Sequence, residues 1–467
     1  MLRASATCEA AGFPTASITC EGFLGQAAAT SIGLGMANLP VALVPGHVAV
    51  QSNEELRRNV AEVTVDRIIA SLTAMPAQAK AGAQEPGARD IVCSGDFETV
   101  NRYFLEHQLS DGLPIVPPTR EKIDEFLRYT DRPADDVLGV LLPDKRAATV
   151  WSIAVNGVMA GCRPEYMPIL VALIEAMADD DYGVEHSGNT PGGETLIILN
   201  GPLIKTLGFN YTQGVMRDGF QPNTSIGRFW RLYLRNVAGF LPHQTDKATF
   251  GNTWRVVVAE NEDTVKKIGW EPISADMGHA AGDDTVTIGR YTGGHVVSSV
   301  SGSTPEEILP NLNNAILLNN SWHITFTVGQ GYGKLRPLMF LSPILAETIA
   351  KAGWSKQDVK RYLFEHARIP AWQFERQLRD WSHKPVWNLA DEVLAGNIPK
   401  FYHESDDPNR LVPIVWKPDD YMIAVTGDPL RTNAYVFGHN GQLGYTVAKR
   451  VQLPRDWDSL LAAARGN

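Results

Sequence analysis

Residues 15–44 read TASITCEGFLGQAAATSIGLGMANLPVALV, and they predict the architecture of the first part of the chain. The run 15–19 is short and rich in β-prone residues, whereas 25–36 is small and apolar with helical character. A second apolar run, 41–44, ends directly before Pro45, as a buried strand does. The order strand, helix, strand predicts two parallel strands that are joined by a crossover helix.

A long amphipathic helix is predicted after these two strands. Ser52 and Glu55 have the spacing of a capping box, and the apolar residues of 56–69 recur on one helical face. The unit over residues 1–74 is therefore βαβα. An open parallel sheet normally holds about five strands and buries both faces. We therefore expect a partial doubly wound unit, Rossmann- or flavodoxin-like, that another segment completes.

A linker is predicted over residues 75–89, MPAQAKAGAQEPGAR, because this stretch is rich in Ala, Gln, Gly and Pro. Residues 90–467 show no comparable break and predict a large mixed α/β domain that carries catalysis or substrate binding. Its predicted helices are 97–109, 120–129, 147–161, 164–178, 224–237, 305–318, 344–352 and 355–367, and its predicted strands are 196–199, 254–259, 285–288, 295–300, 323–328, 421–425 and 445–451.

The composition limits the classes of partner. The chain has 42 Lys and Arg against 52 Asp and Glu, a net charge of −10, so nucleic acid is not an expected partner. No apolar run approaches the ~20 residues of a membrane span, and the N-terminus lacks the apolar stretch of a signal peptide. We therefore expect a cytoplasmic protein without membrane contact. Its four cysteines include no Cys-x-x-Cys pair and do not form a disulfide framework.

The first candidate for chemistry is the segment 156–166, NGVMAGCRPEY. Cys162 lies between two predicted helices, just before Pro164 begins the second one. Free backbone N–H groups and the positive end of a helix dipole lower the pKa of a thiol in such a position. The segment predicts Cys162 as a nucleophile or redox centre and Glu165 as a proton donor. The alternative is that Cys162 packs as a small hydrophobic residue and Glu165 only complements the dipole.

A second candidate is a set of polar residues that could hold a small anionic substrate. Residues 223–227 end a loop at a predicted helix start, which is a ready anion site, and Arg228 adds a forked donor. The alternative is that these residues serve turn geometry and a surface ion pair. The predicted substrate-binding residues are Asn156, Asn200, Gly201, Asn223, Gly227, Arg228, Asn236 and Asp246.

A third candidate lies in the first unit. Cys20 follows the first predicted strand and His47 follows the second. In open α/β sheets the ends of parallel strands form the ligand crevice, so both residues are possible catalytic groups there. The alternative is that Cys20 belongs to the core and His47 to a loop.

Motifs for cofactors and metals are weak. Residues 329–334, GQGYGK, lack the spacing of a phosphate loop and the third glycine of the dinucleotide fingerprint, so the sequence identifies no cofactor. A metal site would have to gather distant residues, and the candidates are His243 with Asp246 and His279 with Asp276 and Asp283.

The chain resembles the UGSC-type (seleno)protein family, which is similar to the B component of glycine reductase. The resemblance over the C-terminal half of the family's domain is carried by residues 9–15, 18–23, 44–47 and 54–72, and that to its large companion region by 111–114, 156–165, 200–202 and 223–228. The resemblance implies thiol or selenol redox chemistry on a small molecule. The family's U/C-G-S-C motif is absent, because the chain begins after the point where it would stand.

Three functions follow as expectations. The leading one is an enzyme that acts on a small polar or anionic molecule by thiol-dependent redox or bond-cleaving chemistry. The second is a metal-dependent lyase or hydrolase. The third is a non-catalytic subunit whose first unit completes the sheet of a partner chain, within a homo-oligomer or hetero-oligomer.

Overall fold

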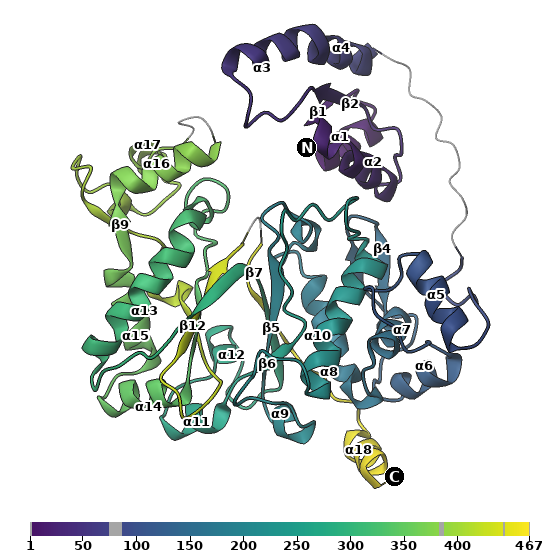
Figure 1. Cartoon of the computed structure of the whole chain (residues 1–467), viewed down its shortest axis with the longest axis vertical. Helices are drawn as coiled ribbons and strands as arrows, with labels where there is room; N and C mark the ends of the chain where they lie inside the picture. Colours follow the sequence, from purple (N-terminus) through teal and green to yellow (C-terminus); the bar gives the residue numbers. More distant parts are fainter. Residues whose placement is uncertain (1, 74–85, 383–386, 442–443, 467) are drawn as a thin grey trace.

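The computed structural model describes residues 2–73, 86–382, 387–441 and 444–466 (Figure 1). The N-terminal unit has the predicted order of strands and helices, preceded by one additional helix. Its two strands pair in parallel, with Ser17 opposite Val41 and Cys20 opposite Val44. Its elements are α1 (Leu2–Ala10), β1 (Ser17–Cys20), α2 (Leu24–Gly33), β2 (Val41–Val44), α3 (Asn53–Asn59) and α4 (Val65–Thr73).

The long helix of this unit begins where the sequence predicts it. The Ser52 side chain accepts from the backbone N–H of Glu55, and the Glu55 carboxylate accepts from the backbone N–H of Ser52. A π-helical turn at Val60–Thr64 joins α3 to α4. α4 packs against β2, but no residue of α4 is buried, and Val65, Ile69 and Leu72 stay exposed. The predicted linker falls mostly on residues 74–85, which lie outside the described residues.

A seven-stranded mixed sheet organises the rest of the chain. The strand order is β11-β8-β12-β7-β5-β6, and β13 pairs with β7 beside this path. The pairs β5·β6 and β11·β8 are parallel, while β7 and β12 pair antiparallel with their neighbours. The strands are β5 (Glu194–Asn200), β6 (Val257–Ala259), β7 (Thr285–Val297), β8 (Leu338–Leu341), β11 (Met422–Val425), β12 (Ala434–His439) and β13 (Val447–Arg450).

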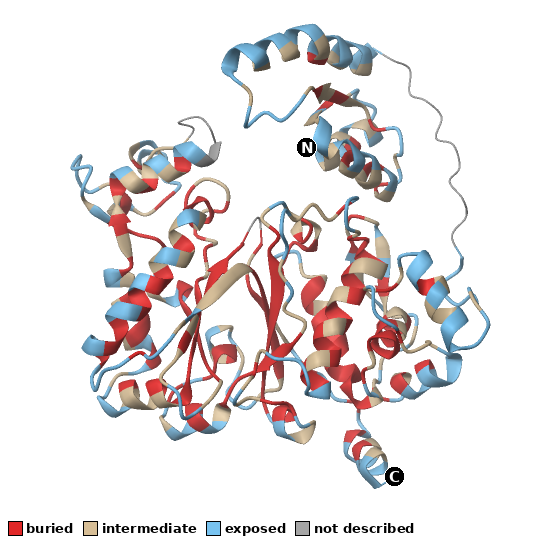
Figure 2. Ribbon diagram, in the orientation of Figure 1, coloured by how far each residue is buried: buried red, intermediate tan, exposed pale blue. Residues whose placement is uncertain are grey.

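Two hydrophobic cores cover the outer faces of this sheet, one at each end. Alternate residues of a strand point to opposite faces of the sheet, and the outward-facing residues belong to these cores. Ile197 and Leu199 of β5 belong to the first core, and Leu341 of β8 and Val425 of β11 belong to the second. The helices of the first core are α7 (Val150–Ala160), α8 (Met167–Met177) and α10 (Gln221–Tyr233), and those of the second are α13 (Pro305–Asn320), α14 (Pro343–Lys351), α15 (Lys356–His366) and α16 (Ala371–Ser382). Figure 2 shows the buried strands between these two layers of helices.

A third cluster joins the two halves of the sheet from the inside. It contains Leu196 and Ile198 of β5 together with Phe340 of β8 and Phe437 of β12, whose rings lie 4.8 Å apart. These residues belong to strands from both ends of the sheet, so the sheet curls around them. The large domain is therefore one α/β body with two helical lobes.

The remaining elements are shorter or lie at the margins of the large domain. They are α5 (Phe97–Glu106), α6 (Arg120–Leu127), α9 (Leu203–Thr206), α11 (Glu262–Lys267), α12 (Ile273–Asp276), α17 (Leu389–Leu394), α18 (Trp457–Gly466), and two antiparallel strand pairs, β3 (Val137–Leu141) with β4 (Arg146–Thr149) and β9 (Arg368–Pro370) with β10 (Leu411–Pro413). Among the described residues, no helix is long and apolar enough to span a membrane.

Several predicted elements differ from the structure. The predicted strand 323–328 is a 3-10 helix, Ser321–Phe326, that continues directly from α13. The two predicted strands 285–288 and 295–300 are parts of one long strand, β7, which carries β5 and β12 on successive halves. The strands β8 and β12 were not predicted, because short buried apolar runs have no periodicity that separates them from helices.

Candidate functional site

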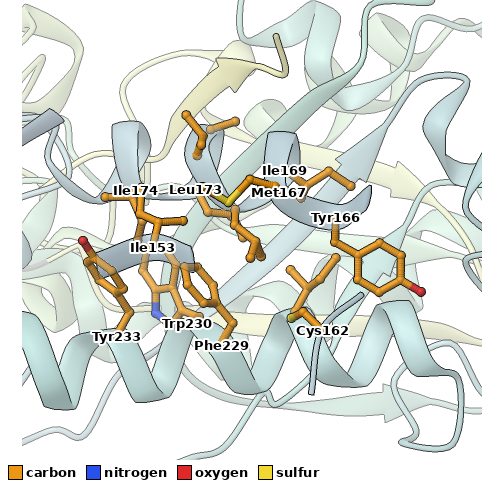
Figure 3. Packing of buried hydrophobic residues seen from close by; sticks show 14 of the residues in the cluster. Ile153, Cys162, Tyr166, Met167, Ile169, Leu173, Ile174, Phe229, Trp230 and Tyr233 are labelled. Atoms are coloured by element: carbon orange, nitrogen blue, oxygen red, sulfur yellow. The ribbon is translucent and has the colours of Figure 1, made fainter. Parts of the chain in front are cut away.

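Cys162 lies in the first hydrophobic core (Figure 3). Its neighbours in that cluster include Tyr166, Met167 and Phe229, and only 9% of the residue is exposed. Its backbone N–H donates to the carbonyl oxygen of Gly157 at 3.0 Å, so this donor is occupied by the end of α7. Neither described cavity includes Cys162 in its lining.

The expectation of an ionised thiol at Cys162 is wrong. Burial raises the pKa of this thiol to about 12, and the nearby Ser225 hydroxyl and Arg228 only partly oppose that shift. The helix dipole does not help, because the chain forms a single 3-10 turn at Pro164–Tyr166 before α8 begins. The environment keeps the thiol protonated at neutral pH. Glu165, the predicted proton donor, is also buried and forms an ion pair with Arg163.

The predicted anion site at residues 223–227 lies inside a helix. α10 begins at Gln221, so Asn223 lies in its first turn and the N–H of Thr224 already donates to the carbonyl oxygen of Phe220 at 2.9 Å, which places residues 224–227 within the helix. The Asn223 amide instead donates to the carbonyl oxygen of Val257 at 2.8 Å and accepts from the N–H of Asn210 at 2.9 Å. These contacts attach α10 to β6.

Arg228 is paired with Asp111 within the protein. Its Nε and Nη2 donate to the two carboxylate oxygens of Asp111 at 3.0 and 2.8 Å. Burial opposes ionisation of Asp111, but Arg228 and Arg255 outweigh it and hold the pKa of Asp111 below its usual value. The forked donor predicted to bind substrate is therefore occupied by an internal carboxylate.

The other predicted residues of this set also have partners in the protein. Asn156 accepts from the Asn236 amide at 2.9 Å, which ties α7 to the turn after α10. Asp246 pairs with Arg231, which also lies 3.3 Å from Glu194. Gly227 packs against the backbone of residues 255–256, where a Cβ atom would come within 2.4 Å.

Cys20 and His47 lie where the sequence places them, at the ends of β1 and β2. Cys20 is half-buried, and exposed His47 accepts from the N–H of Ala49 at 3.2 Å through Nδ1. The N-terminal unit contacts the large domain elsewhere, through Gln26 and the carbonyl oxygen of Thr245 at 3.5 Å. These two residues and Cys162 do not line a common cavity among those described.

A cavity of about 540 Å³ opens at the carboxyl ends of the parallel strands β5 and β6, near α9, α11 and α12 at the lower edge in Figure 1. The crevice beyond the carboxyl ends of parallel strands is where open α/β sheets bind ligands. Of the predicted substrate-binding residues, only Gly201 lines this cavity, and Asn200 precedes it. The lining also includes Pro202, Ile204, Lys205, Tyr211, Glu260, Glu262, Asp263, Val265, Lys266, Gly269, Trp270, Glu271, Pro272, Ala281 and Gly282.

Two glutamates and the Asn200 amide form a hydrogen-bonded group in this cavity. The Asn200 Nδ2 donates to Glu260 Oε2 at 2.7 Å and to Glu262 Oε1 at 2.9 Å, and the N–H of Gly201 also donates to Glu262 Oε1 at 2.8 Å. Glu260 accepts two more N–H bonds, from Ile273 and Val425, so it joins β6 to α12 and β11. Burial raises the pKa of Glu260, although these donors oppose the shift.

Asp284 adjoins the same group from the start of β7. Its Oδ1 accepts from the N–H of Leu203 at 2.7 Å, and Gly201 is so close that a Cβ there would lie 2.4 Å from this oxygen. Burial, followed by repulsion from Glu262 and Asp283, raises the pKa of Asp284 to about 6. Asp284 lines a second cavity of about 410 Å³, and Gly282 lines both cavities.

Glu260, Glu262 and Asp284 were not predicted from the sequence. Glu260 and Glu262 come directly after β6, much as Cys20 stands at the end of β1, so the same rule of polar residues at the end of a buried strand could have identified them. Asp284 had no such signal, because β7 runs antiparallel to β5 and brings its first residues to the end of β5.

The predicted metal sites do not form within the part of the chain that the structure describes. No group of three or more His, Cys, Asp or Glu side chains there is arranged to hold a metal ion. Asp276 pairs with Lys356 and Lys360, and Asp283 pairs with Arg450. These carboxylates are therefore committed to ion pairs.

The fold and the cavity define an α/β protein with an acidic cavity beyond the ends of two parallel strands. Residues 1–74 match the UGSC family, so the N-terminal unit belongs to that family, as its sequence predicts. No curated protein and no solved structure matches the chain. The resemblance of residues 90–467 to the companion region of that family stays a prediction.

Proposed function

We propose that the chain is an enzyme that acts on a small polar molecule in the cavity beyond β5 and β6, by acid–base chemistry of carboxyl groups. The observation that carries this proposal is that Glu262 lines this cavity, while Asp284 lines the adjoining cavity of about 410 Å³ and accepts from the N–H of Leu203 beside the end of β5. An Asp pKa of about 6 allows proton exchange near neutral pH, which suits a general base or acid.

The roles follow from the contacts. Asp284 is the proton-transferring group, and it is held through its hydrogen bond with Leu203. Glu262 contacts the substrate and keeps Asp284 protonated to a higher pH by charge repulsion. Asn200 and Glu260 position Glu262 and do not transfer protons themselves.

A turnover screen tests this proposal. Wild-type protein is incubated with mixtures of small polar compounds, and consumption is followed by NMR. We expect Asp284→Asn to lower turnover by about 10²-fold or more, since general acid–base groups contribute about 10²–10⁴-fold. Glu98→Gln, an exposed carboxylate of α5 outside both cavities, is the control and should keep turnover. Equal turnover by wild type and Asp284→Asn contradicts the assigned role.

A second candidate function belongs to the N-terminal unit, which would complete the sheet of a partner chain or of another copy. Its sheet has two strands, and α4 exposes Val65, Ile69 and Leu72 on one face at 41%, 54% and 43%. Parallel sheets in stable domains bury both faces, so this arrangement supports an additional partner. The predicted thiol chemistry would then belong to Cys20 and His47 at the edge of the completed sheet.

Light scattering after gel filtration tests the second candidate, with the chain alone and with co-expressed candidate partners. We expect a mass above the 51.2 kDa of one chain, and Ile69→Glu should abolish the association. The control Glu62→Gln lies on the same helical segment and should leave the mass unchanged. Association that survives Ile69→Glu contradicts this use of the α4 face.

A further inference from the structure

We infer that the cavity beyond β5 and β6 selects a compact organic cation, an amine carried as its ammonium ion on a short apolar body. This inference rests on the proposed function, because it names the substrate class of the same cavity. It replaces the anionic substrate that the sequence predicted, whose binding group, Arg228, is occupied by Asp111.

The charges that line the cavity favour a cation. Four carboxylates line it, whereas the cationic residues are Lys205 and Lys266. The Nζ of Lys205 lies 2.5 Å from Oδ1 of Asp263, so this lysine is neutralised within the lining. Glu262 and Glu271 then face one remaining exposed lysine, Lys266, whereas the cation that favours ionisation of buried Glu260 is Lys356. The carboxylate of Asp284 lies just beyond Gly282 and adds to the negative potential, whereas Asp283 is paired with Arg450.

The hydrogen-bonding groups at the inner end of the cavity call for a donor. Glu262 Oε1 accepts from Gly201 and from Asn200, and the Asn200 amide nitrogen is used by both glutamates. The Oδ1 of Asn200 has no hydrogen-bond partner among the described residues, but it is fully buried and Asn200 does not line the cavity, so the acceptor within reach of a ligand is the Glu262 carboxylate. The N–H donors of Asn200 and Gly201 are therefore already used, whereas the carboxylate oxygens can accept further hydrogen bonds. An ammonium group matches this arrangement, because it donates three hydrogen bonds and accepts none.

The wall of the cavity suits the rest of such a molecule. Trp270, Ile204 and Val265 provide an apolar surface, and the Trp270 ring is held by a hydrogen bond from Nε1 to the carbonyl oxygen of Trp354 at 3.0 Å. An aromatic face attracts an organic cation as well as an alkyl chain. A bare metal ion would gain nothing from this wall.

Three probes of equal length test the inference, namely n-butylammonium, n-butanol and butyrate. Their binding to the full chain is measured by titration calorimetry and saturation-transfer NMR. We expect n-butylammonium to bind most tightly, butanol less tightly and butyrate least. Glu262→Gln should weaken butylammonium binding by about tenfold or more, because a hydrogen bond to a charged group contributes about 1.5–3 kcal/mol.

Two controls separate charge from folding. Lys266→Glu changes an exposed rim residue, so it should leave the fold intact, strengthen butylammonium binding severalfold and leave butanol binding unchanged. Glu98→Gln, on exposed α5 and outside the cavity, should leave all three affinities unchanged. Thermal unfolding of Glu262→Gln shows whether that variant keeps its fold.

The outcomes distinguish this inference from the proposed function. Tighter binding of butyrate than of butylammonium overturns the cation class while the cavity remains a binding site. Butylammonium binding that neither Glu262→Gln nor Lys266→Glu changes also overturns it, since the ion would then bind elsewhere. Failure of all three probes to bind contradicts both the cation class and the proposed function.

Discussion

Asn200 shows how a residue predicted to contact substrate takes a different part in the site. Its amide donates to Glu260 and Glu262, so it sets the positions of two carboxylates at the end of β5. An asparagine after a strand is consistent with turn geometry, ligand contact or support of a neighbour. Only the partners of its amide hydrogens distinguish these roles.

Asp284 gives a prediction at the level of one carboxyl group. Its folded pKa of about 6 exceeds the unfolded value of about 3.9, so the folded state binds the proton more tightly. By linkage, its ionisation destabilises the fold as pH rises from about 4 to 6. Asp284→Asn should therefore raise the free energy of unfolding by about 1 kcal/mol at pH 7.5, a value reduced for partial solvent exposure, and change it little at pH 4.

Urea unfolding of the wild type and Asp284→Asn at pH 4.5 and 7.5 measures this difference. Asp283→Asn is the control, and it should not stabilise the protein at pH 7.5 because it removes an ion pair with Arg450 at 3.0 Å. A stability gain of Asp284→Asn that is equal at both pH values would show that ionisation is not its cause.

The buried thiol of Cys162 gives a second prediction about a single side chain, namely its chemical reactivity. With a pKa of about 12 and no place in the lining of either described cavity, its thiol should not react with Ellman's reagent in the native protein at pH 8. Cys8 is exposed, and Cys20 and Cys93 are half-buried, so these thiols should react first. Cys162→Ala should leave the native thiol count unchanged and lower the count in urea by one. Loss of a native thiol in that variant contradicts the burial argument.

The helix α10 shows why element boundaries matter for site prediction. The sequence predicts its start at Thr224 or Ser225, but Pro222 stands within its first turn and the helix begins at Gln221. This shift of about one turn places Asn223 and Gly227 inside the helix. Their functional interpretation depended on a helix start at Thr224 or Ser225, whereas the N–H of Thr224 already donates within the helix, to the carbonyl oxygen of Phe220.

Gly227 gives a prediction about the contact between α10 and β6. A Cβ at this position would lie 2.4 Å from the backbone carbonyl carbon of Arg255, which cannot move without displacing β6. Gly227→Ala should therefore lower the free energy of unfolding by about 1–3 kcal/mol or more. The control is Gly25→Ala in α2, where the nearest atom lies at 4.0 Å, and a gain of about 0.5–1 kcal/mol is expected.

Chemical denaturation measures both glycine variants. If Gly227→Ala lowers the free energy of unfolding and Gly25→Ala raises it, the loss at Gly227 comes from steric contact and not from helix propensity. A Gly227→Ala variant as stable as the wild type would mean that α10 can move away from β6 without cost.

The two parts of the molecule differ in the size of their hydrophobic cores, which are extensive in the large domain and small in the N-terminal unit. The large domain encloses a curled sheet between two cores, and every residue of β5 is buried (Figure 2). The N-terminal unit has a two-stranded sheet and only a small cluster around Ala6, Leu34 and Leu39. Its attachment to the body is also limited, and includes the bond from Lys145 Nζ to the carbonyl oxygen of Leu34 at 3.1 Å.

This contrast predicts uneven protection from hydrogen exchange. Opening free energy follows local burial, so amides of β1 and β2 should exchange at least about 10²-fold faster than those of β5 and β7. Hydrogen–deuterium exchange with mass spectrometry of the full chain measures this ratio at a low and a high protein concentration. Equal protection of both parts at low concentration, where association is weakest, contradicts the view that the isolated unit is incomplete.

The amino-acid sequence alone determined the α/β class, the βαβα order of the N-terminal unit and its capping box at Ser52. These features depend on local periodicity and on neighbours within four residues, which the sequence contains directly. It also identified the UGSC-family character of residues 1–74, which the family match confirms.

The site depended on contacts that cross long stretches of chain. Asp284 meets Leu203 because β7 pairs antiparallel with β5, and Arg228 meets Asp111 because the first core brings their segments together. The burial that raises the pKa of Cys162 comes from helices that surround it in space. Charge, solvation and partner choice are properties of the packed molecule, so no reading of local residue order could assign them.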